Sequence, residues 1–233
     1  MTRDAMKNQE RRQLYGRRQG HKLRGRQAAL MEELLPQVRI DPLDPRMMTP
    51  ARLFSPPKEQ VWLEIGFGGG EHLVSQARAH SDVGFLGAEP FVNGVAKLLS
   101  EIDTEELANV RIYPDDARAL LDVLADESIA RVFLLYPDPW PKVRHNKRRF
   151  VSGDNLEQLH RVMKQDGMFR FASDIPDYVR WTLREIQLHG GFEWIAQGPS
   201  EWRTPPSDWP GTRYEAKALR EGRTPTYLDF MRK

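Results

Sequence analysis

The chain has 233 residues, of which 39% are hydrophobic and 29% are charged, with 17 Gly and 17 Pro. This composition is typical of a globular protein and excludes collagen-like, low-complexity and wholly disordered chains. The absence of Cys excludes disulfides, thiolate nucleophiles and Cys-ligated metal sites. No apolar run approaches the ~20 residues of a membrane span and no secretory signal is visible, so we expect a cytoplasmic protein without membrane contact.

Positive charge is concentrated in two segments. Residues 1–26 carry nine Lys and Arg against two acids, a net charge of +7, whereas the rest of the chain carries −5. The second segment is a run without acids, made of Lys142, Arg144, Lys147, Arg148 and Arg149. A basic tail alone is typical of a solvated leader, but a basic run inside a patterned region favours a polyanionic partner.

The hydrophobic pattern predicts alternating strands and helices. A short helix is expected over 28–35 and a loop or linker over 41–50, so that the core begins after Pro57. Strands are expected at 61–65, 83–89, 110–113, 129–136, 168–173, 192–196 and 226–231. Helices are expected from about 70, from about 91, and over 117–125, 153–164 and 176–189. This alternation predicts an α/β fold with a doubly wound, mostly parallel sheet of seven strands.

A glycine-rich turn follows the first strand, where Gly66, Gly68, Gly69 and Gly70 come directly after Glu64 and Ile65. Nucleotides bind at such turns in open α/β sheets. The dinucleotide fingerprint would place a third glycine where Glu71 stands, so a pyrophosphate would meet two carboxylates. S-adenosylmethionine carries positive charge and no phosphate, and the acids therefore favour this methyl donor. A tight turn without any ligand remains the alternative.

Further acids follow the next strands. Glu89 ends the second strand, where a carboxylate can accept hydrogen bonds from both ribose hydroxyls of a nucleotide. Dehydrogenases share this feature, so it does not distinguish them from methyltransferases. Asp116 follows the third strand and could accept a hydrogen bond from the amino group of adenine, although Asp is also common as the N-cap of a helix. Asp138 and Trp140 follow the fourth strand in a loop stiffened by three prolines, which would hold them beside the glycine turn. The alternative is that the prolines only end the strand and that Trp140 packs in the core.

Together these residues resemble the bacterial tRNA (guanine-N(7)-)-methyltransferases, a family of class I S-adenosylmethionine-dependent methyltransferases. The resemblance runs from about Val61 to the C-terminus. It rests on residues 64–70, 89–91, 138–142, 147–149, 173–174 and 212–215. The family often has another residue, such as His, where Pro141 stands, and residues 1–35 match only loosely.

The resemblance implies the Rossmann-like class I methyltransferase fold, with residues 1–57 as a basic extension and linker and 58–233 as the catalytic domain. It implies methyl transfer from S-adenosylmethionine to N(7) of a guanine in the variable loop of tRNA. The donor would contact Glu64, Gly66, Gly68, Glu89, Asp116 and Asp138, and Asp138 would also be the catalytic residue. The substrate would contact Lys142, Asp174, Thr212, Arg213, Tyr214 and Glu215, with Arg144, Lys147, Arg148 and Arg149 on the RNA.

The expected partner is tRNA, with no obligatory protein partner, and the chain is expected to be a monomer or a homodimer. We expect no metal, because none of the six His residues forms a ligand pair. We also predict that neutralising Arg148 and Arg149 weakens tRNA binding and flattens its dependence on salt.

The residues themselves leave alternatives open. Thr212 and Glu215 fit a capping box, with Thr212 as the N-cap and Glu215 reaching back, and Asp174 could be a simple helix cap. An NAD-dependent dehydrogenase is disfavoured by Glu64 and Glu71. A non-catalytic RNA-binding module would not need acids at the strand ends. A methyltransferase that acts on another RNA, a protein or a small molecule is the nearest competitor, and the basic run disfavours small molecules.

Overall fold

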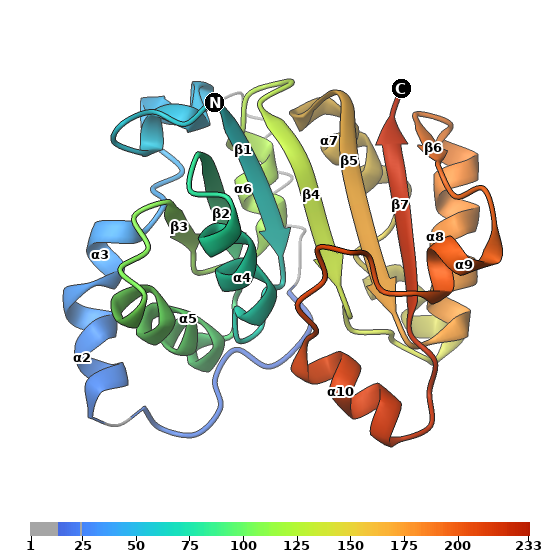
Figure 1. The fold of residues 1–233 in the computed structure, drawn as a ribbon, viewed down its shortest axis with the longest axis horizontal. Coiled ribbons are helices and arrows are strands. Elements are labelled where there is room, and N and C mark those ends of the chain that lie inside the picture. Colours follow the sequence, from blue (N-terminus) through green and yellow to red (C-terminus); the bar gives the residue numbers. More distant parts are fainter. Residues whose placement is uncertain (1–13, 24) are drawn as a thin grey trace.

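The computed structural model describes residues 14–23 and 25–233, in which a seven-stranded sheet lies between helices on both faces (Figure 1). The strands are β1 (Gln60–Ile65), β2 (Val83–Ala88), β3 (Val110–Tyr113), β4 (Ile129–Leu135), β5 (Met163–Ser173), β6 (Phe192–Trp194) and β7 (Thr226–Arg232). Their order is β3-β2-β1-β4-β5-β7-β6. Strands β1 to β5 are parallel, and β7 is antiparallel to both β5 and β6. The predicted mostly parallel, seven-stranded sheet is therefore confirmed.

Helices connect the strands, and each helix predicted from the sequence is present to within a few residues. The α-helices are α2 (Arg26–Glu33), α3 (Leu35–Val38), α4 (Glu71–Ala79), α5 (Val92–Thr104), α6 (Ala117–Val123), α7 (Gly153–Val162), α8 (Pro176–His189), α9 (Pro199–Arg203) and α10 (Arg213–Arg220). The described residues also form the short 3-10 helices η1 (Pro45–Met48), η2 (Pro50–Leu53) and η3 (Val143–Arg148). The pattern did not predict the 3-10 helices, because such short turns contain too few residues to show a hydrophobic period.

The sheet separates two hydrophobic cores. Successive side chains of a strand point to opposite faces, so Leu63 of β1 lies in one core and Trp62 lies in the other. Because helices cover both faces, β2 is buried along its whole length. This double cover fixes the strand ends in place, and the loops after them can therefore position functional side chains.

The core begins earlier in the chain than predicted. Leu30 and Val38 lie in one core, and Ile40, Met47 and Phe54 lie in the other. The backbone N–H of Ile40 also donates a hydrogen bond of 2.7 Å to the carbonyl of Ile112 in β3. The expectation that the core begins after Pro57 is therefore wrong, because prolines interrupt regular helices without preventing burial of the side chains between them. The domain boundary at residue 57 stays a prediction, and residues 1–13 of the basic tail lie outside the described part of the chain.

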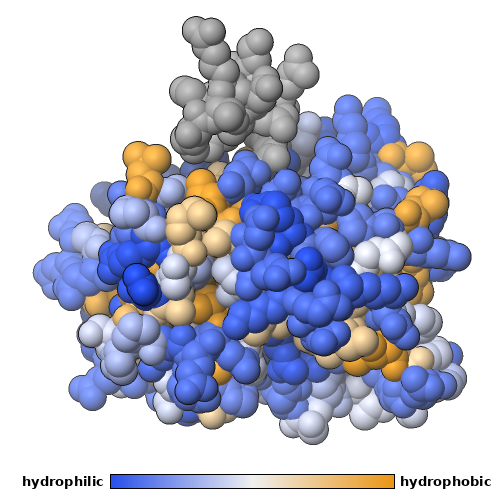
Figure 2. Space-filling model, turned by 90° about the horizontal axis from the view of Figure 1, so that it is seen from above, coloured by the Kyte–Doolittle hydropathy of each residue, from blue (hydrophilic) through white to orange (hydrophobic). Residues whose placement is uncertain are grey.

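The two edges of the parallel strands differ. The carboxyl ends of β1, β2 and β4 lie at the lower edge in Figure 1, where the segment from residue 14 to residue 23 also runs. The opposite face is mostly hydrophilic, with small separate hydrophobic patches (Figure 2), as is ordinary for a surface in water. Within the described residues, no helix has the length and apolar character needed to cross a bilayer.

Candidate active site

A cavity of about 530 Å³ lies at the carboxyl edge of the sheet. Its wall includes the glycine turn after β1, the end of β2, the start of α6 and the loop after β4. Ligands of open α/β sheets bind where the strand order reverses, which here is between β1 and β4. The volume also falls in the range of ~300–1,000 Å³ typical of small-molecule sites.

The glycine turn is shaped by backbone that only glycine adopts readily. Gly66 and Gly68 have φ values of 70° and 57°, and both line the cavity. A Cβ atom on Gly94 of α5 would lie 2.1 Å from the carbonyl oxygen of Gly68, so glycine is also needed on the helix that packs against the turn. The turn thus exposes its backbone to the cavity, as the sequence predicts.

Glu89 holds the turn and faces the cavity at the same time. Its Oε2 accepts a hydrogen bond of 2.7 Å from the N–H of Gly68, and its Oε1 accepts one of 2.9 Å from the N–H of Phe91. Burial raises the pKa of Glu89, the two amide hydrogen bonds oppose this rise, and the negative charges of Asp138 and Glu64 add to it. Each carboxylate oxygen can accept a second hydrogen bond, so the group can still receive ligand hydroxyls.

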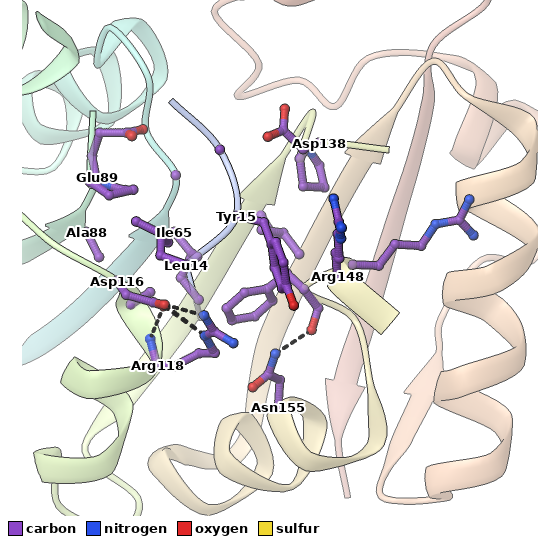
Figure 3. A pocket seen from close by; sticks show the side chains of 18 of the residues that line it. Leu14, Tyr15, Ile65, Ala88, Glu89, Asp116, Arg118, Asp138, Arg148 and Asn155 are labelled. Atoms are coloured by element: carbon purple, nitrogen blue, oxygen red, sulfur yellow. Dashed lines mark hydrogen bonds and ion pairs between the residues drawn. The ribbon is translucent and has the colours of Figure 1, made fainter. Parts of the chain in front are cut away.

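Asp138 lies across the cavity from Glu89 (Figure 3). Burial raises the pKa of Asp138 above its ordinary value. Its carboxylate forms no hydrogen bond with any other residue that the structure describes. Two carboxylates whose negative charge is disfavoured therefore face one cavity, and a bound cation would relieve both of them.

Two other acids near the glycine turn do not line the cavity. Glu64 is only 5% exposed, and its Oε2 pairs with Nδ1 of His72 at 2.7 Å. Glu71 forms ion pairs with Lys97 at 2.6 Å and with Arg213 at 3.0 Å. The sequence argument that both carboxylates would meet a pyrophosphate is therefore weaker than it appeared, because both charges have partners. Contact between Glu64 and a donor stays a prediction.

Asp116 is both a helix cap and a wall of the cavity. It is the N-cap of α6, where its Oδ1 accepts a hydrogen bond of 3.0 Å from the N–H of Arg118. The Arg118 guanidinium also pairs with the carboxylate, as Figure 3 shows. The capping role that the sequence allowed is confirmed, and a contact with adenine stays a prediction.

The N-terminal segment returns to the cavity, which the sequence did not predict. Leu14, Tyr15, Gly16 and Arg17 all line it, and Tyr15 lies in the pocket between Glu89 and Arg148 (Figure 3). The carbonyl of Arg18 accepts a hydrogen bond of 2.9 Å from the N–H of Val92. Asn93 Oδ1 accepts one of 2.7 Å from the N–H of Gly20. The only signal in the sequence was one aromatic residue within a basic tail.

The members of the basic run differ in their exposure to solvent. Lys142, Arg144 and Lys147 are exposed. The Arg148 guanidinium lies over the rings of Tyr15, at 4.3 Å, and Trp140, at 5.0 Å, both measured to the ring centroid.

Arg149 has a side chain that is only 1% exposed. A guanidinium buried in this way is not available to a phosphate at the surface of this structure, and contact between Arg149 and RNA stays a prediction. A run of cations in the sequence does not reveal which side chain turns inward.

Residues 212–215 begin α10 beside the glycine turn. Thr212 is the N-cap and accepts a hydrogen bond of 3.1 Å from the N–H of Glu215. Arg213 is exposed, and Tyr214 lines the cavity and stacks on Tyr136 with ring centroids 6.4 Å apart. Of these three residues, Tyr214 lines the cavity and Thr212 and Arg213 do not, and substrate contacts of all three stay predictions.

Glu215 does not complete the predicted capping box. Its carboxylate accepts hydrogen bonds from Nε1 of Trp209, at 2.7 Å, and from the hydroxyl of Tyr227. It is only 7% exposed, so it fixes the start of α10 from inside the protein. Asp174, at the end of β5, pairs with Arg223 at 2.5 Å. Substrate contacts of Asp174 and Glu215 stay predictions.

Within residues 14–23 and 25–233, no group of three or more His, Asp or Glu side chains is arranged to hold a metal ion.

Comparisons with known proteins agree with this geometry. The family described as "Putative methyltransferase" matches residues 58–228. The chain is 54% identical to the tRNA (guanine-N(7)-)-methyltransferase of a Chelativorans species and 52% identical to that of Agrobacterium fabrum. Each alignment covers 94% of both chains. The fold is similar to that of the 16S rRNA methyltransferase KamB, with a TM-score of 0.54 at 14% identity over 76% of this chain and 89% of that one. The chain therefore belongs to the family of tRNA (guanine-N(7)-)-methyltransferases.

Proposed function

We propose that this protein transfers a methyl group from S-adenosylmethionine to N(7) of a guanine in the variable loop of tRNA, in the cytoplasm. The names of its relatives support the reaction. The observation that carries it is a cavity at the strand-order reversal, in which Glu89 and Asp138 face a ligand beside a loop of exposed cations. A positively charged donor and a polyanionic acceptor suit these two neighbouring surfaces.

The residues at the sheet edge fit the methyl donor. Gly66 and Gly68 bring backbone to the ligand without side chains, and Glu89 and Asp116 offer acceptors for hydroxyl and amino groups. The donor supplies a methyl group on a positively charged sulfur, which becomes neutral when the methyl group has left. Burial raises the pKa of Glu89 and of Asp138, so the negative charge of both carboxylates is disfavoured. A cationic ligand beside them would favour this charge.

Asp138 acts on the acceptor through its charge. N(7) of guanine has a free lone pair, so no base is needed to remove a proton before attack. The purine ring becomes positively charged as the new bond forms. A carboxylate held beside the ring stabilises this state more than it stabilises the neutral base, which lowers the barrier. The prolines around Asp138 keep the group in place during the reaction.

Replacing Asp138 tests this role. In Asp138→Ala we expect the single-turnover rate to fall by roughly 10²–10³-fold, the effect typical of losing one electrostatic contact to a transition state. The affinity for tRNA should change by less than about threefold, because RNA affinity comes mainly from phosphate contacts. Rapid-quench kinetics and filter binding measure the two quantities. Equal losses in both would show that Asp138 only shapes the binding surface.

The exposed cations next to Asp138 provide the RNA surface. Lys142, Arg144 and Lys147 can approach phosphates from the loop that follows β4. Such contacts give affinity and sensitivity to salt but no choice of base. The choice of one guanine requires an exposed base and the shape of folded tRNA.

Donor binding and methyl transfer together test the proposed function. Isothermal titration should detect stoichiometric binding of S-adenosylhomocysteine, and a methyl-labelled donor should label an unmodified tRNA transcript. A matched transcript with adenine in place of the variable-loop guanine should stay unlabelled. No heat of binding, or equal labelling of both transcripts, would contradict the proposal.

A further inference from the structure

We propose that Arg149 is a positioning residue that holds the loop carrying Asp138, and that it makes no contact with RNA phosphates. This inference rests on the proposed function, because it assigns Arg149 a part in the same reaction. It begins from the contrast with Arg144 and Lys147, which belong to the same basic run and are exposed.

The guanidinium of Arg149 is enclosed by protein on several sides. Its Nε donates a hydrogen bond of 2.9 Å to the carbonyl of Pro139, and its Nη2 pairs with Asp177 at 2.5 Å. Its charged centre lies 4.9 Å from the ring centroid of Tyr178 and 5.2 Å from that of Trp181. The side chain thus connects the loop after β4 to the first turns of α8.

The loop that contains Asp138 depends on this connection. Pro137, Pro139 and Pro141 have no N–H groups to donate. Among interactions with described residues, the bond from Arg149 to Pro139 is the only hydrogen bond that residues 137–141 make. Tyr136 and Trp140, on either side of Asp138, have φ values of 50° and 44°. Non-glycine residues with positive φ are strained, and this conformation persists only where the surrounding structure holds it.

Arginine is suited to this position and lysine is not. The planar guanidinium donates from Nε and Nη2 in fixed directions while its faces lie against two aromatic rings. A lysine ammonium could reach Pro139 or Asp177 but has no flat face to place between Tyr178 and Trp181. The conservative variant Arg149→Lys therefore keeps the charge and loses the geometry.

Kinetics on Arg149→Lys test the proposal against direct RNA contact. We expect the single-turnover rate at saturating donor and tRNA to fall by about 10–100-fold, since small misplacements of reacting groups have effects of this size. We expect the slope of log tRNA affinity against log salt to equal that of the wild type. The contact variant Arg144→Gln, in contrast, should lower tRNA affinity and reduce this slope by about 0.7–0.9. Calorimetry with S-adenosylhomocysteine shows that each variant is folded.

Ile186→Val is the control for stability. It shortens a buried side chain of α8 and leaves Pro139 and Asp177, the two acceptors of Arg149, in place, so we expect a rate near that of the wild type with a lower melting temperature. If Arg149→Lys does not fold, Arg149→Gln replaces it, because its amide can still donate to one of the two acceptors. Failure of both to bind S-adenosylhomocysteine at any temperature would show a role in folding alone and overturn the proposal.

Other results would also overturn it. A reduced salt slope in Arg149→Lys, with the wild-type rate restored at saturating tRNA, would identify a phosphate contact. An unchanged rate, or a rate loss that Ile186→Val reproduces at equal melting temperature, would remove the positioning role. A wild-type protein that methylates no tRNA would instead refute the proposed function.

Discussion

Asp138 combines exposure to the cavity with a pKa that burial raises. Its folded state binds a proton more tightly than its unfolded state does, so its charge destabilises the fold at neutral pH. This destabilisation is complete above the raised pKa and disappears as the pH falls below the ordinary value of about 3.9. Functional carboxylates often have this property, because the site is built for a ligand.

Asp138→Asn should therefore raise the melting temperature of the ligand-free protein at pH 7, by an amount on the order of 1–2 °C for a chain of this size. The gain should shrink as the pH falls through the raised pKa and should be absent below the ordinary value. Differential scanning calorimetry at a series of pH values measures it. A gain that persists unchanged at low pH would show that it does not come from the charge.

The sequence could identify which residue types belong to the site, but not the direction of each side chain. Glu64 and Glu89 both end parallel strands, yet Glu89 faces the cavity and Glu64 pairs with His72. Arg148 and Arg149 are neighbours and both line the cavity, yet Arg148 lies over the rings of Tyr15 and Trp140, whereas Arg149 is buried and pairs with Asp177. Side-chain direction depends on tertiary packing, which a spacing rule does not contain.

At the scale of elements, the pair of Glu64 and His72 joins β1 to α4. The His72 ring packs against Phe133 of β4, at 4.6 Å, and against Trp209, at 5.4 Å, measured between ring centroids. Trp209 in turn donates to Glu215 at the start of α10. The element behind the donor cavity and the segment expected to bind the acceptor thus share one buried cluster.

His72→Phe keeps the ring and removes the hydrogen bond to Glu64. We expect the affinity for S-adenosylhomocysteine to fall by roughly 10-fold and the free energy of unfolding to fall by about 1–3 kcal/mol, because a buried carboxylate loses its partner. Titration calorimetry and urea unfolding measure these quantities. The matched control is His80→Phe, at the other end of α4, which should keep donor affinity. Equal affinities of His72→Phe and the wild type would contradict this account.

The loop after β4 should supply the salt-dependent part of tRNA binding. Arg144→Gln and Lys147→Gln should each reduce the slope of log affinity against log salt by about 0.7–0.9. With one phosphate contact removed, binding of the protein releases fewer counterions from the tRNA. Filter binding at several salt concentrations measures the slope. Arg52→Gln, an exposed cation in η2 before β1, should leave it unchanged. A common effect of all three variants would show a diffuse attraction without a defined loop contact.

Most elements could be predicted because the hydrophobic period changes between strands and helices. The start of β5 could not, since Lys164 to Gly167 has the composition of a turn. Met163 pairs with Ile129 of β4 and Met168 pairs with Arg131, and the register shifts between these two pairs. The hydrophobic pattern also did not predict that β7 is antiparallel to its neighbours, because strand direction depends on partners far apart in the sequence.

At the scale of the whole molecule, the segment before β1 belongs to the core. Ile40 is 1% exposed and bonds to β3 through its backbone. The segment from residue 14 to residue 23 runs along the carboxyl edge of the sheet, and its residues 14–17 line the cavity. A contact between residue 15 and residue 148 could not be predicted, since no local pattern connects them.

Ile40→Ala should lower the free energy of unfolding by about 2–5 kcal/mol, the usual effect of a cavity in a packed core. Leu43→Ala is the control, because Leu43 is 77% exposed, and its effect should stay within about 0.5 kcal/mol. Urea unfolding compares the two variants with the wild type. Similar small effects would show that this segment is dispensable to the core.

The most direct test of the account is to identify and locate the modified nucleotide. An unmodified tRNA transcript is incubated with the protein and S-adenosylmethionine, and its nuclease fragments and nucleosides are analysed by mass spectrometry. The account predicts 7-methylguanosine at the variable-loop guanine. A different methylated nucleoside, a methyl group elsewhere in the tRNA, or no methyl group would contradict it.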